Sequence, residues 1–229
     1  MFNQIIGNFT SQITPQIWQL IGEGTFDTVY MSFVATLFAV LLGLPLGVIT
    51  FLTQQGQSLE NKRTNRILEV LINIGRSIPF IILLFDLMDI TRFLVGTTLG
   101  TTAAIIPLSV SALPFFARLT ANALSDIPSG LTETAKAMGT NVWQLVTKFY
   151  LPEALPTLIK AITLTLVALI GYSAMAGTVG GGGLGHIAIS YGLHRNMPSV
   201  LWIATIIIVL IVMLCEKYGN KLADHFDHR

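Results

Sequence analysis

Ionisable side chains are scarce in this sequence. Only 11% of its 229 residues are charged and 52% are hydrophobic, whereas an ordinary soluble domain is about 25% charged. So few charges cannot cover the surface of a water-soluble protein. The formal net charge of +1 also gives neither the basic excess expected of a nucleic-acid binder nor the acidic block typical of a disordered tail. The composition therefore excludes those classes and indicates a membrane protein.

Cysteine and metal-ligand patterns are also missing. The single cysteine, Cys215, cannot form an internal disulfide, and a cysteine-based metal site is excluded with it. The four histidines, His186, His194, His225 and His228, show no metal-ligand spacing, and no Ser–His–Asp set can be assembled on one side of a bilayer. We expect no catalytic residue, no metal and no cofactor in this chain.

The first 25 residues lack Lys, Arg and a compact apolar stretch followed by a small-residue cleavage site. They therefore do not read as a removable signal peptide. Their spaced apolar residues predict a short amphipathic piece that rests at the membrane interface. These residues are Ile13, Ile17, Trp18, Leu20 and Ile21.

What the sequence does contain is long apolar runs, and a run of about 20 such residues can cross the hydrocarbon core. We predict an all-α polytopic membrane protein, a single permease domain over 1–229, with spans at 28–53, 67–87, 100–117, 156–177 and 198–215. The first is longer than a core of roughly 30 Å requires. Gly43, Pro45 and Gly47 lie where a kink would shorten it, or they are the ordinary Gly and Pro content of membrane helices.

The second span contains a cation, Arg76, next to Ser77 and Pro79. A lone Arg at mid-membrane costs about 2.5–3.5 kcal/mol on insertion scales. We therefore expect Arg76 to face protein or water. Beyond this span, Asp89 and Arg92 either pair on a helix or mark the membrane surface.

The distribution of cations predicts the orientation, because cytoplasmic segments are enriched in Lys and Arg. Of the thirteen Lys and Arg residues, all but Arg76, Arg92 and Arg195 fall after the first span, after the third span or in the tail. The N-terminus is therefore predicted outside and the C-terminus inside. This arrangement places the long connection between the third and fourth spans in the cytoplasm.

That connection, residues 129–150, is predicted to form two short helices broken at Gly139. Glycine supplies a left-handed stop, and Asn141 is a suitable N-cap for the second helix. The second helix would carry an apolar face that needs burial, either by a partner or by this chain's own helices and the lipid surface. The face consists of Val142, Leu145, Val146 and Phe149, with Trp143 beside it.

The same connection resembles the cytoplasmic signature of binding-protein-dependent ABC importer permeases. The pattern Glu133-x-Ala135-x-x-x-Gly139, nine residues, then Phe149-x-Leu151-Pro152 has the spacing of Glu-Ala-Ala, three residues, Gly, nine residues, Ile-x-Leu-Pro. Two positions depart from the signature, Thr134 for Ala and Phe149 for Ile. In that type I family the segment forms coupling helices that dock into a separate ATPase. The resemblance therefore implies ATPase-coupling roles for Glu133, Ala135, Gly139, Leu151 and Pro152.

Further segments resemble the permeases of methionine importers in particular: 76–84, 100–107 and 171–185. His186 stands where that branch would have an acidic residue. The resemblance implies a five-helix core, a homodimer, two copies of an ABC ATPase that binds ATP and Mg, an extracytoplasmic methionine-binding protein and a bacterial inner membrane. It implies import of methionine in both L and D forms. A same-class importer of another amino acid, a phosphonate or a quaternary amine is the alternative. A secondary transporter fits less well, because paired repeats and embedded acidic relays are missing.

The fourth span ends in a glycine run over 177–185. It is not a phosphate loop, because no Gly-Lys-Ser/Thr follows. Glycine permits positive φ where a regular helix must end, so the run is either a loop lining the pathway mouth or a plain turn. Just before it, Tyr172, Ser173 and Met175 are candidate pathway or gate residues, with Met175 facing its symmetry mate or packing in the core.

Overall fold

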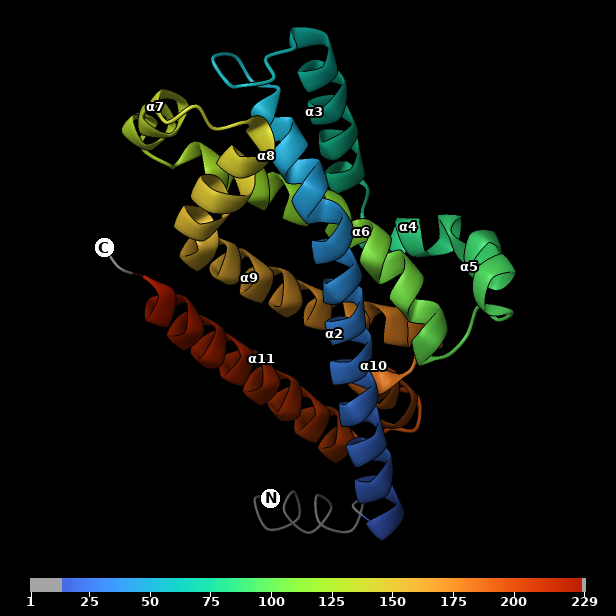
Figure 1. The fold of residues 1–229 in the computed structure, drawn as a ribbon. Coiled ribbons are helices and arrows are strands. Elements are labelled where there is room, and N and C mark those ends of the chain that lie inside the picture. Colours follow the sequence, from blue (N-terminus) through green and yellow to red (C-terminus); the bar gives the residue numbers. More distant parts are fainter. Residues whose placement is uncertain (1–13, 228–229) are drawn as a thin grey trace. The chain divides into compact units, whose positions relative to one another are not determined.

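The computed structural model describes residues 14–227, and the regular structure over this range is helical (Figure 1). This confirms the all-α prediction. The elements are α2 (Pro15–Leu52), α3 (Lys62–Ser77), α4 (Phe80–Asp86), α5 (Met88–Val95), α6 (Thr101–Ser125), α7 (Ser129–Ala137), α8 (Val142–Gln144), the π-helix η1 (Leu145–Tyr150), α9 (Leu151–Thr178), α10 (Gly183–Ile187), the π-helix η2 (Ala188–Leu193) and α11 (Pro198–Phe226).

Four helical stretches in the described range are long and apolar enough to cross a membrane. They are α2, α6, the stretch Val142–Leu193, which is interrupted by the turn at 179–182, and α11. The pair α3 and α4 makes a fifth if it counts as one broken span. Each of the five predicted segments falls on one of these stretches, and most of the helices extend beyond the predicted bounds.

The beginning of α2 differs from the prediction. The helix starts at Pro15 and continues without interruption to Leu52, so the amphipathic piece predicted at residues 13–21 is, from Pro15 onward, the first part of this long helix. Ile17 and Ile21 are buried in an apolar cluster, whereas Trp18 is exposed. One side of this segment therefore packs on neighbouring helices of the protein. Ile13 lies outside the described residues.

The second predicted span is divided. Helix α3 ends at Ser77, and Ile78 and Pro79 take extended backbone angles before α4 begins at Phe80. The break follows from Pro79, which disfavours helical geometry at the residue before it. Arg76 is exposed in the last turn of α3, where a cation is stabilised by the helix dipole.

Two compact units divide the described chain. One contains the residues before Leu37 together with Pro79–Ser109 and Leu166–Cys215; the other contains Leu37–Ile78, Val110–Thr165 and the residues from Glu216 onward. We call them the first and the second unit. The helices α2, α6, α9 and α11 each contribute residues to both units.

The core of the first unit joins the start of α2 to α10 and α11. Its buried members are Ile17, Ile21, Leu184, Ile187, Ala188, Val200 and Ala204. A buried hydrogen bond accompanies this packing, since the Leu184 N–H donates to Thr28 Oγ1 at 2.8 Å. The hydroxyl pairs a backbone group that would otherwise be orphaned at the start of α10.

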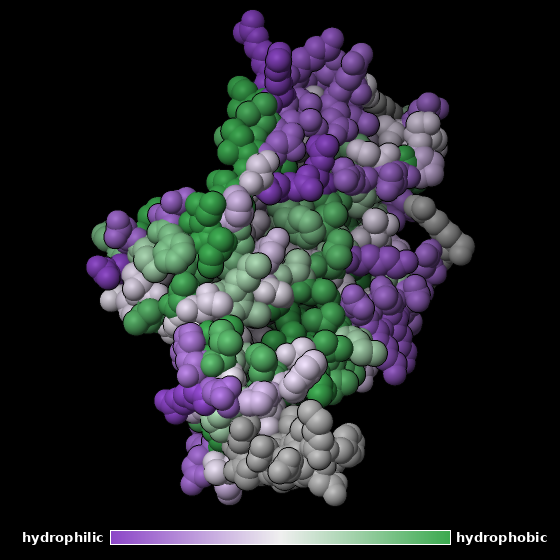
Figure 2. All heavy atoms as spheres, turned by 180° about the vertical axis from the view of Figure 1, so that it is seen from behind, coloured by the Kyte–Doolittle hydropathy of each residue, from purple (hydrophilic) through white to green (hydrophobic). Residues whose placement is uncertain are grey.

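The second unit is built where α2 packs closely on α6. A Cβ added to Gly47 would lie 2.5 Å from the Ala117 carbonyl oxygen, and one added to Gly43 would lie 3.0 Å from that of Leu113. These glycines therefore permit close helix approach. Helix α3 is joined to the end of α2 by Asn65, whose Nδ2 donates to the Thr50 carbonyl at 2.9 Å. The outer face of α3, at the upper left of Figure 2, is apolar below a hydrophilic tip.

Candidate functional site

The predicted coupling segment folds around the turn at Gly139. Its φ is +70°, the left-handed conformation that ends α7. The Thr140 hydroxyl donates to the Ala135 carbonyl at 2.9 Å, which satisfies an orphan acceptor at the end of α7. Asn141 and Gln144 then form a reciprocal capping box, with bonds of 2.8 and 3.1 Å. The predicted stop at Gly139 and cap at Asn141 are both confirmed.

Helix α7 packs on the rest of the second unit through its buried face. Ala135 is fully buried in a cluster with Phe51, Leu124 and Tyr150, where a larger side chain would not fit. Tyr150 packs edge-on against Phe51, with 5.3 Å between ring centroids, and its hydroxyl lies 3.1 Å from the Thr132 hydroxyl. Glu133, two residues before Ala135, is exposed. The buried alanine thus fixes the face of α7 that presents this carboxylate.

The apolar face after Asn141 is covered by this chain itself. Leu145 and Val146 are buried, and Val142 and Phe149 pack against the same cluster. This decides between the two predicted alternatives in favour of internal packing. The large apolar side chains that remain exposed near the turn are Met138 and Trp143, at 69% and 75%. Glu133, also exposed, lies on the same segment.

The second predicted short helix is not separate, which corrects the sequence interpretation. Helix α8 continues through the π-helix η1 into α9, so residues 142–178 form one helical run. Pro152 lies inside this continuous run, directly after η1, so its missing N–H falls in a helix interior beside the irregular π-helical turn. Leu151 is partly buried against the α7 cluster, and Pro152 is exposed. The two residues therefore do not share one exposed face.

A hollow of about 310 Å³ adjoins Glu133 within the second unit. Its lining comes from α2, the connection to α3, α6 and α7: Phe51, Gly56, Gln57, Leu124, Ser125, Ile127, Ser129, Thr132 and Glu133. In the adjoining connection, Gln57 Oε1 and Ser58 Oγ are buried without a hydrogen-bond partner in the described chain. Sequence reasoning missed this loop, because its Gln, Gly and Ser content is that of an ordinary turn.

The three predicted pathway residues do not share one environment. Tyr172 and Met175 are exposed on α9, at 38% and 49%. The Tyr172 ring stacks on Phe80, with 5.0 Å between centroids. Ser173 is buried, and its hydroxyl donates to the Ile170 carbonyl at 2.7 Å. The structure therefore brings Tyr172 and Met175 to a partly exposed face of α9, where Tyr172 contacts Phe80, and buries Ser173 within the first unit.

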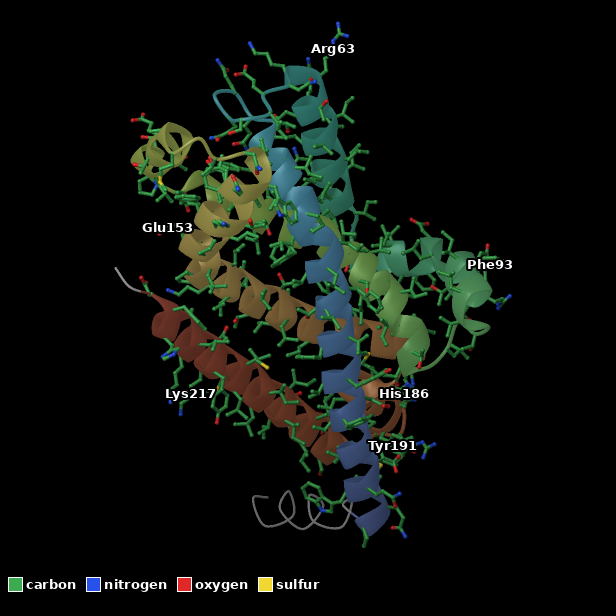
Figure 3. All side chains as sticks on the ribbon, in the orientation of Figure 1. Arg63, Phe93, Glu153, His186, Tyr191 and Lys217 are labelled. Carbon is green, nitrogen blue, oxygen red and sulfur yellow. The ribbon has the colours of Figure 1, made fainter. Side chains whose placement is uncertain are left out.

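The glycine run has the backbone freedom that the sequence predicts. Gly180, Gly182 and Gly183 have φ values of +87°, +77° and +76°. Gly185 packs directly on the backbone of Ala174, so the run folds back onto the end of α9. His186, labelled with Tyr191 in Figure 3, lies 3.3 Å through Nδ1 from the Gly177 carbonyl. His186, which stands where the methionine-importer branch would have an acidic residue, thus makes a local contact within the chain.

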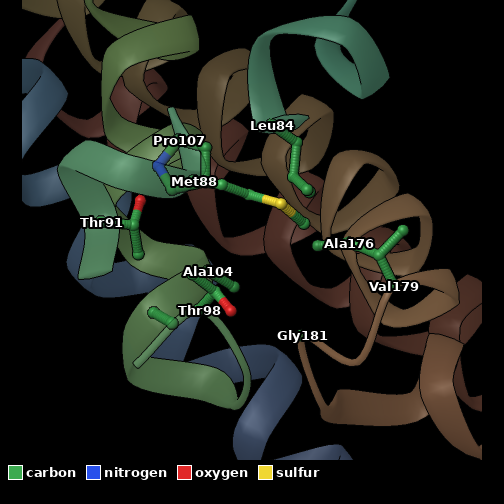
Figure 4. Close-up of a pocket in the computed structure, with 10 residues that line it drawn as sticks. Leu84, Met88, Thr91, Thr98, Ala104, Pro107, Ala176, Val179 and Gly181 are labelled. Carbon is green, nitrogen blue, oxygen red and sulfur yellow. The ribbon is translucent and has the colours of Figure 1, made fainter. Parts of the chain in front are cut away.

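A small pocket of about 20 Å³ lies beside this run in the first unit (Figure 4). Met88 extends across it toward Ala176 and Val179, and Thr91 and Thr98 lie at its other side. A volume of roughly 10–15 Å³ is needed to hold one water molecule. The pocket therefore has room for about one water and does not hold an amino acid in this conformation.

The described residues contain no cluster of three or more His, Cys, Asp or Glu that could hold a metal ion. They contain helices that are long and apolar enough to cross a membrane. They also contain a segment that turns at a glycine and exposes one acidic side chain, and a partly exposed helix face with Tyr172 and Met175. This is the architecture of a transport permease.

Residues 43–229 match the family described as "Binding-protein-dependent transport system inner membrane component". The chain belongs to this family, whose members are multi-pass permeases of the inner membrane and not enzymes. Among similar proteins, the "Probable D-methionine transport system permease protein MetI" of Pasteurella multocida is 69% identical over 217 residues, covering 95% of this chain and all of the relative. The D-methionine transport system permease protein of Escherichia coli K12 is 48% identical over 163 residues, covering 71% of this chain and 75% of the relative.

A solved chain of the MetNI methionine ABC transporter in an inward-facing conformation superposes with a TM-score of 0.93. It is 42% identical and covers 94% of this chain and 100% of its own length. The similarity therefore extends over nearly the whole chain.

Proposed function

We propose that this chain is the permease subunit of an ATP-driven ABC importer and forms the path by which methionine, in L and D forms, crosses the inner membrane. One observation carries the proposal: 69% identity over the full length of a D-methionine permease. The fold agrees, since the chain superposes on the permease of a methionine ABC transporter over 94% of its residues.

The energy source in this proposal is a separate ATPase subunit, which binds ATP and Mg. Its docking surface on this chain is the exposed side of the coupling segment, with Glu133, Met138 and Trp143. Ala135 and Leu151 act by positioning, because they are buried or partly buried beneath it. Gly139 shapes the turn, and Pro152 lies exposed at the start of α9.

The continuity of the helix after Asn141 suggests how docking reaches the pathway. Leu151 and Met175 lie on the same helix, α9, about 36 Å apart at 1.5 Å per residue. When the ATPases close, a push on α7 and α8 moves one end of α9, and the face with Tyr172 and Met175 moves with it. A packed bundle with two arrangements converts such a movement into alternating access.

The complete assembly we propose contains two copies of this chain, two ATPase subunits and an extracytoplasmic methionine-binding protein. The N-terminus lies outside and the C-terminus in the cytoplasm, as the distribution of Lys and Arg predicts. Met175 of each copy faces the symmetry axis, where a flexible thioether can close a narrow path.

Uptake of labelled methionine tests the substrate assignment. Cells that lack their own methionine importers should gain uptake when they express this chain with its ATPase and binding protein. Unlabelled L- and D-methionine should compete, and phosphonates and quaternary amines should not. If the complex forms and hydrolyses ATP but another solute competes instead, the importer class stands and methionine is wrong.

A further inference from the structure

The start of α3 carries three cations without an internal counterion. Lys62, Arg63 and Arg66 are exposed, and in the described part of the chain none of their side chains is in an ion pair or hydrogen bond. Arg63 extends away from the ribbon in Figure 3. Asn61 caps this helix by accepting from the Arg63 and Thr64 N–H groups at 3.1 Å. The cap fixes the helix start and with it the backbone positions of the cations.

These charges oppose the helix dipole. The N-terminal turn of a helix carries partial positive charge and favours anions, yet the first turn of α3 has no acidic residue. The cations therefore repel both one another and the helix end. A charge pattern that breaks a local rule without internal compensation is typical of a functional site.

Nearby carboxylates are already occupied elsewhere. Glu69, the acidic residue within α3, pairs with Arg118 of α6 at 3.1 Å. Glu60, just before the helix, accepts a hydrogen bond from the Gly56 N–H at 2.9 Å. Within the described chain neither carboxylate forms an ion pair with the three cations.

An apolar groove continues from the cations along the same helix face. It has a volume of about 380 Å³ and is lined by Arg63, Arg66, Ile67, Val70 and Leu71. The apolar side chains are 49–60% exposed. Figure 2 shows this face of α3 as an apolar strip below a hydrophilic tip. The opposite side packs inward through Ile72, which is buried.

We propose that this face of α3 binds an anionic phospholipid. Arg63 and Arg66 take the headgroup phosphate, with Lys62 beside them, and an acyl chain lies along Ile67, Val70, Leu71 and the next exposed residue, Ile74. The family is an inner-membrane one, so phospholipid surrounds the chain. A basic cluster at the membrane boundary next to an apolar surface matches such a lipid in both charge and polarity.

Neither free phosphate nor a second copy fits as well. Inorganic phosphate would leave the apolar groove unused. A second copy packed through the same face would bring identical cations together, because a two-fold contact pairs a surface with itself.

The test is lipid binding to the purified full-length chain in detergent, measured by native mass spectrometry during titration. Phosphatidylglycerol should bind more tightly than phosphatidylcholine. Each cation near an anionic lipid contributes about fivefold in affinity, so R63Q/R66Q should weaken phosphatidylglycerol binding roughly thirtyfold. The preference should also shrink as salt screens the charges.

The matched control is K217Q/K221Q, which removes the same charge from exposed positions of α11 and should leave the affinity within about twofold of the wild type. Equal binding of both lipids, equal loss in the control variant, or displacement of the lipid by inorganic phosphate would overturn the proposal. So would a disulfide between two copies of L71C/C215A, because it would show a second copy on this face. Gel filtration of each variant checks that the chain remains folded.

Discussion

Replacing Gly139 by valine perturbs the turn between α7 and α8 without a steric clash. The φ of +70° is a conformation that side chains rarely adopt, and no atom lies within 4 Å of a Cβ added there. The cost therefore comes from the backbone alone. It is about 1–2 kcal/mol for an ordinary residue and more for a β-branched one, which is enough to shift a local equilibrium by roughly 5- to 30-fold.

Relaxation of this turn would move the docking surface. The Thr140 bond to the Ala135 carbonyl and the Asn141 capping box both depend on the path of the chain through residue 139. We expect G139V to insert into the membrane normally and to lose most ATPase co-purification and methionine uptake. G139N should retain both, because asparagine tolerates the left-handed conformation.

Gly96 provides the matched control. It ends α5 with a φ of +83° and also has open space around it, so G96V has a similar backbone cost but belongs to the first unit, whereas the coupling segment belongs to the second. Co-purification of the ATPase with G96V should be unchanged. Wild-type ATPase binding by G139V, or an equal loss of binding in G96V, would refute the reasoning.

Three further substitutions test other parts of the structure. G47A should lower the melting temperature in detergent, with a cost of about 1–3 kcal/mol from overpacking between α2 and α6, whereas G22A, in open space on the same helix, should be neutral or stabilising by about 1 kcal/mol. T28V should cost about 1–3 kcal/mol, because it leaves a buried backbone N–H unpaired, whereas T25V removes only a bond to its own helix and should cost less; equal costs would contradict the assignment. M175C, in a background without the native cysteine, should form a disulfide between two copies in at least one nucleotide state, and its absence in every state would exclude Met175 from the axis.

Much of the fold follows from local chemistry. Apolar runs without charges predict the spans, whereas they do not predict the division of the second span at Pro79. Glycine at positions that require positive φ predicts the stop at Gly139 and the irregular run at Gly180 and Gly182. These features depend on a residue's own backbone preferences, so the sequence contains the signal.

The features that the sequence did not predict depend mainly on packing between segments that are distant in sequence. The sequence at the start of α2 predicts an interfacial helix, because an apolar stripe alone does not show what covers it. In the structure the stripe packs on Leu184 and Val200, which are far away in sequence. The face after Asn141 is buried by Phe51 and Leu124, which is one of the two alternatives that the sequence left open, because its apolar pattern does not say which surface covers it. The helix continues through Pro152 directly after the π-helix η1, and a π-helix has no sequence signature that predicts it.

Reconstitution into lipid vesicles tests the coupling of this chain to an ATPase most directly. Vesicles that contain the chain with its ATPase and binding protein should accumulate labelled methionine when ATP and Mg are supplied to the face that carries residues 129–150. Vesicles that contain the chain alone should not accumulate it. Accumulation by the chain alone, without ATP, would contradict the account.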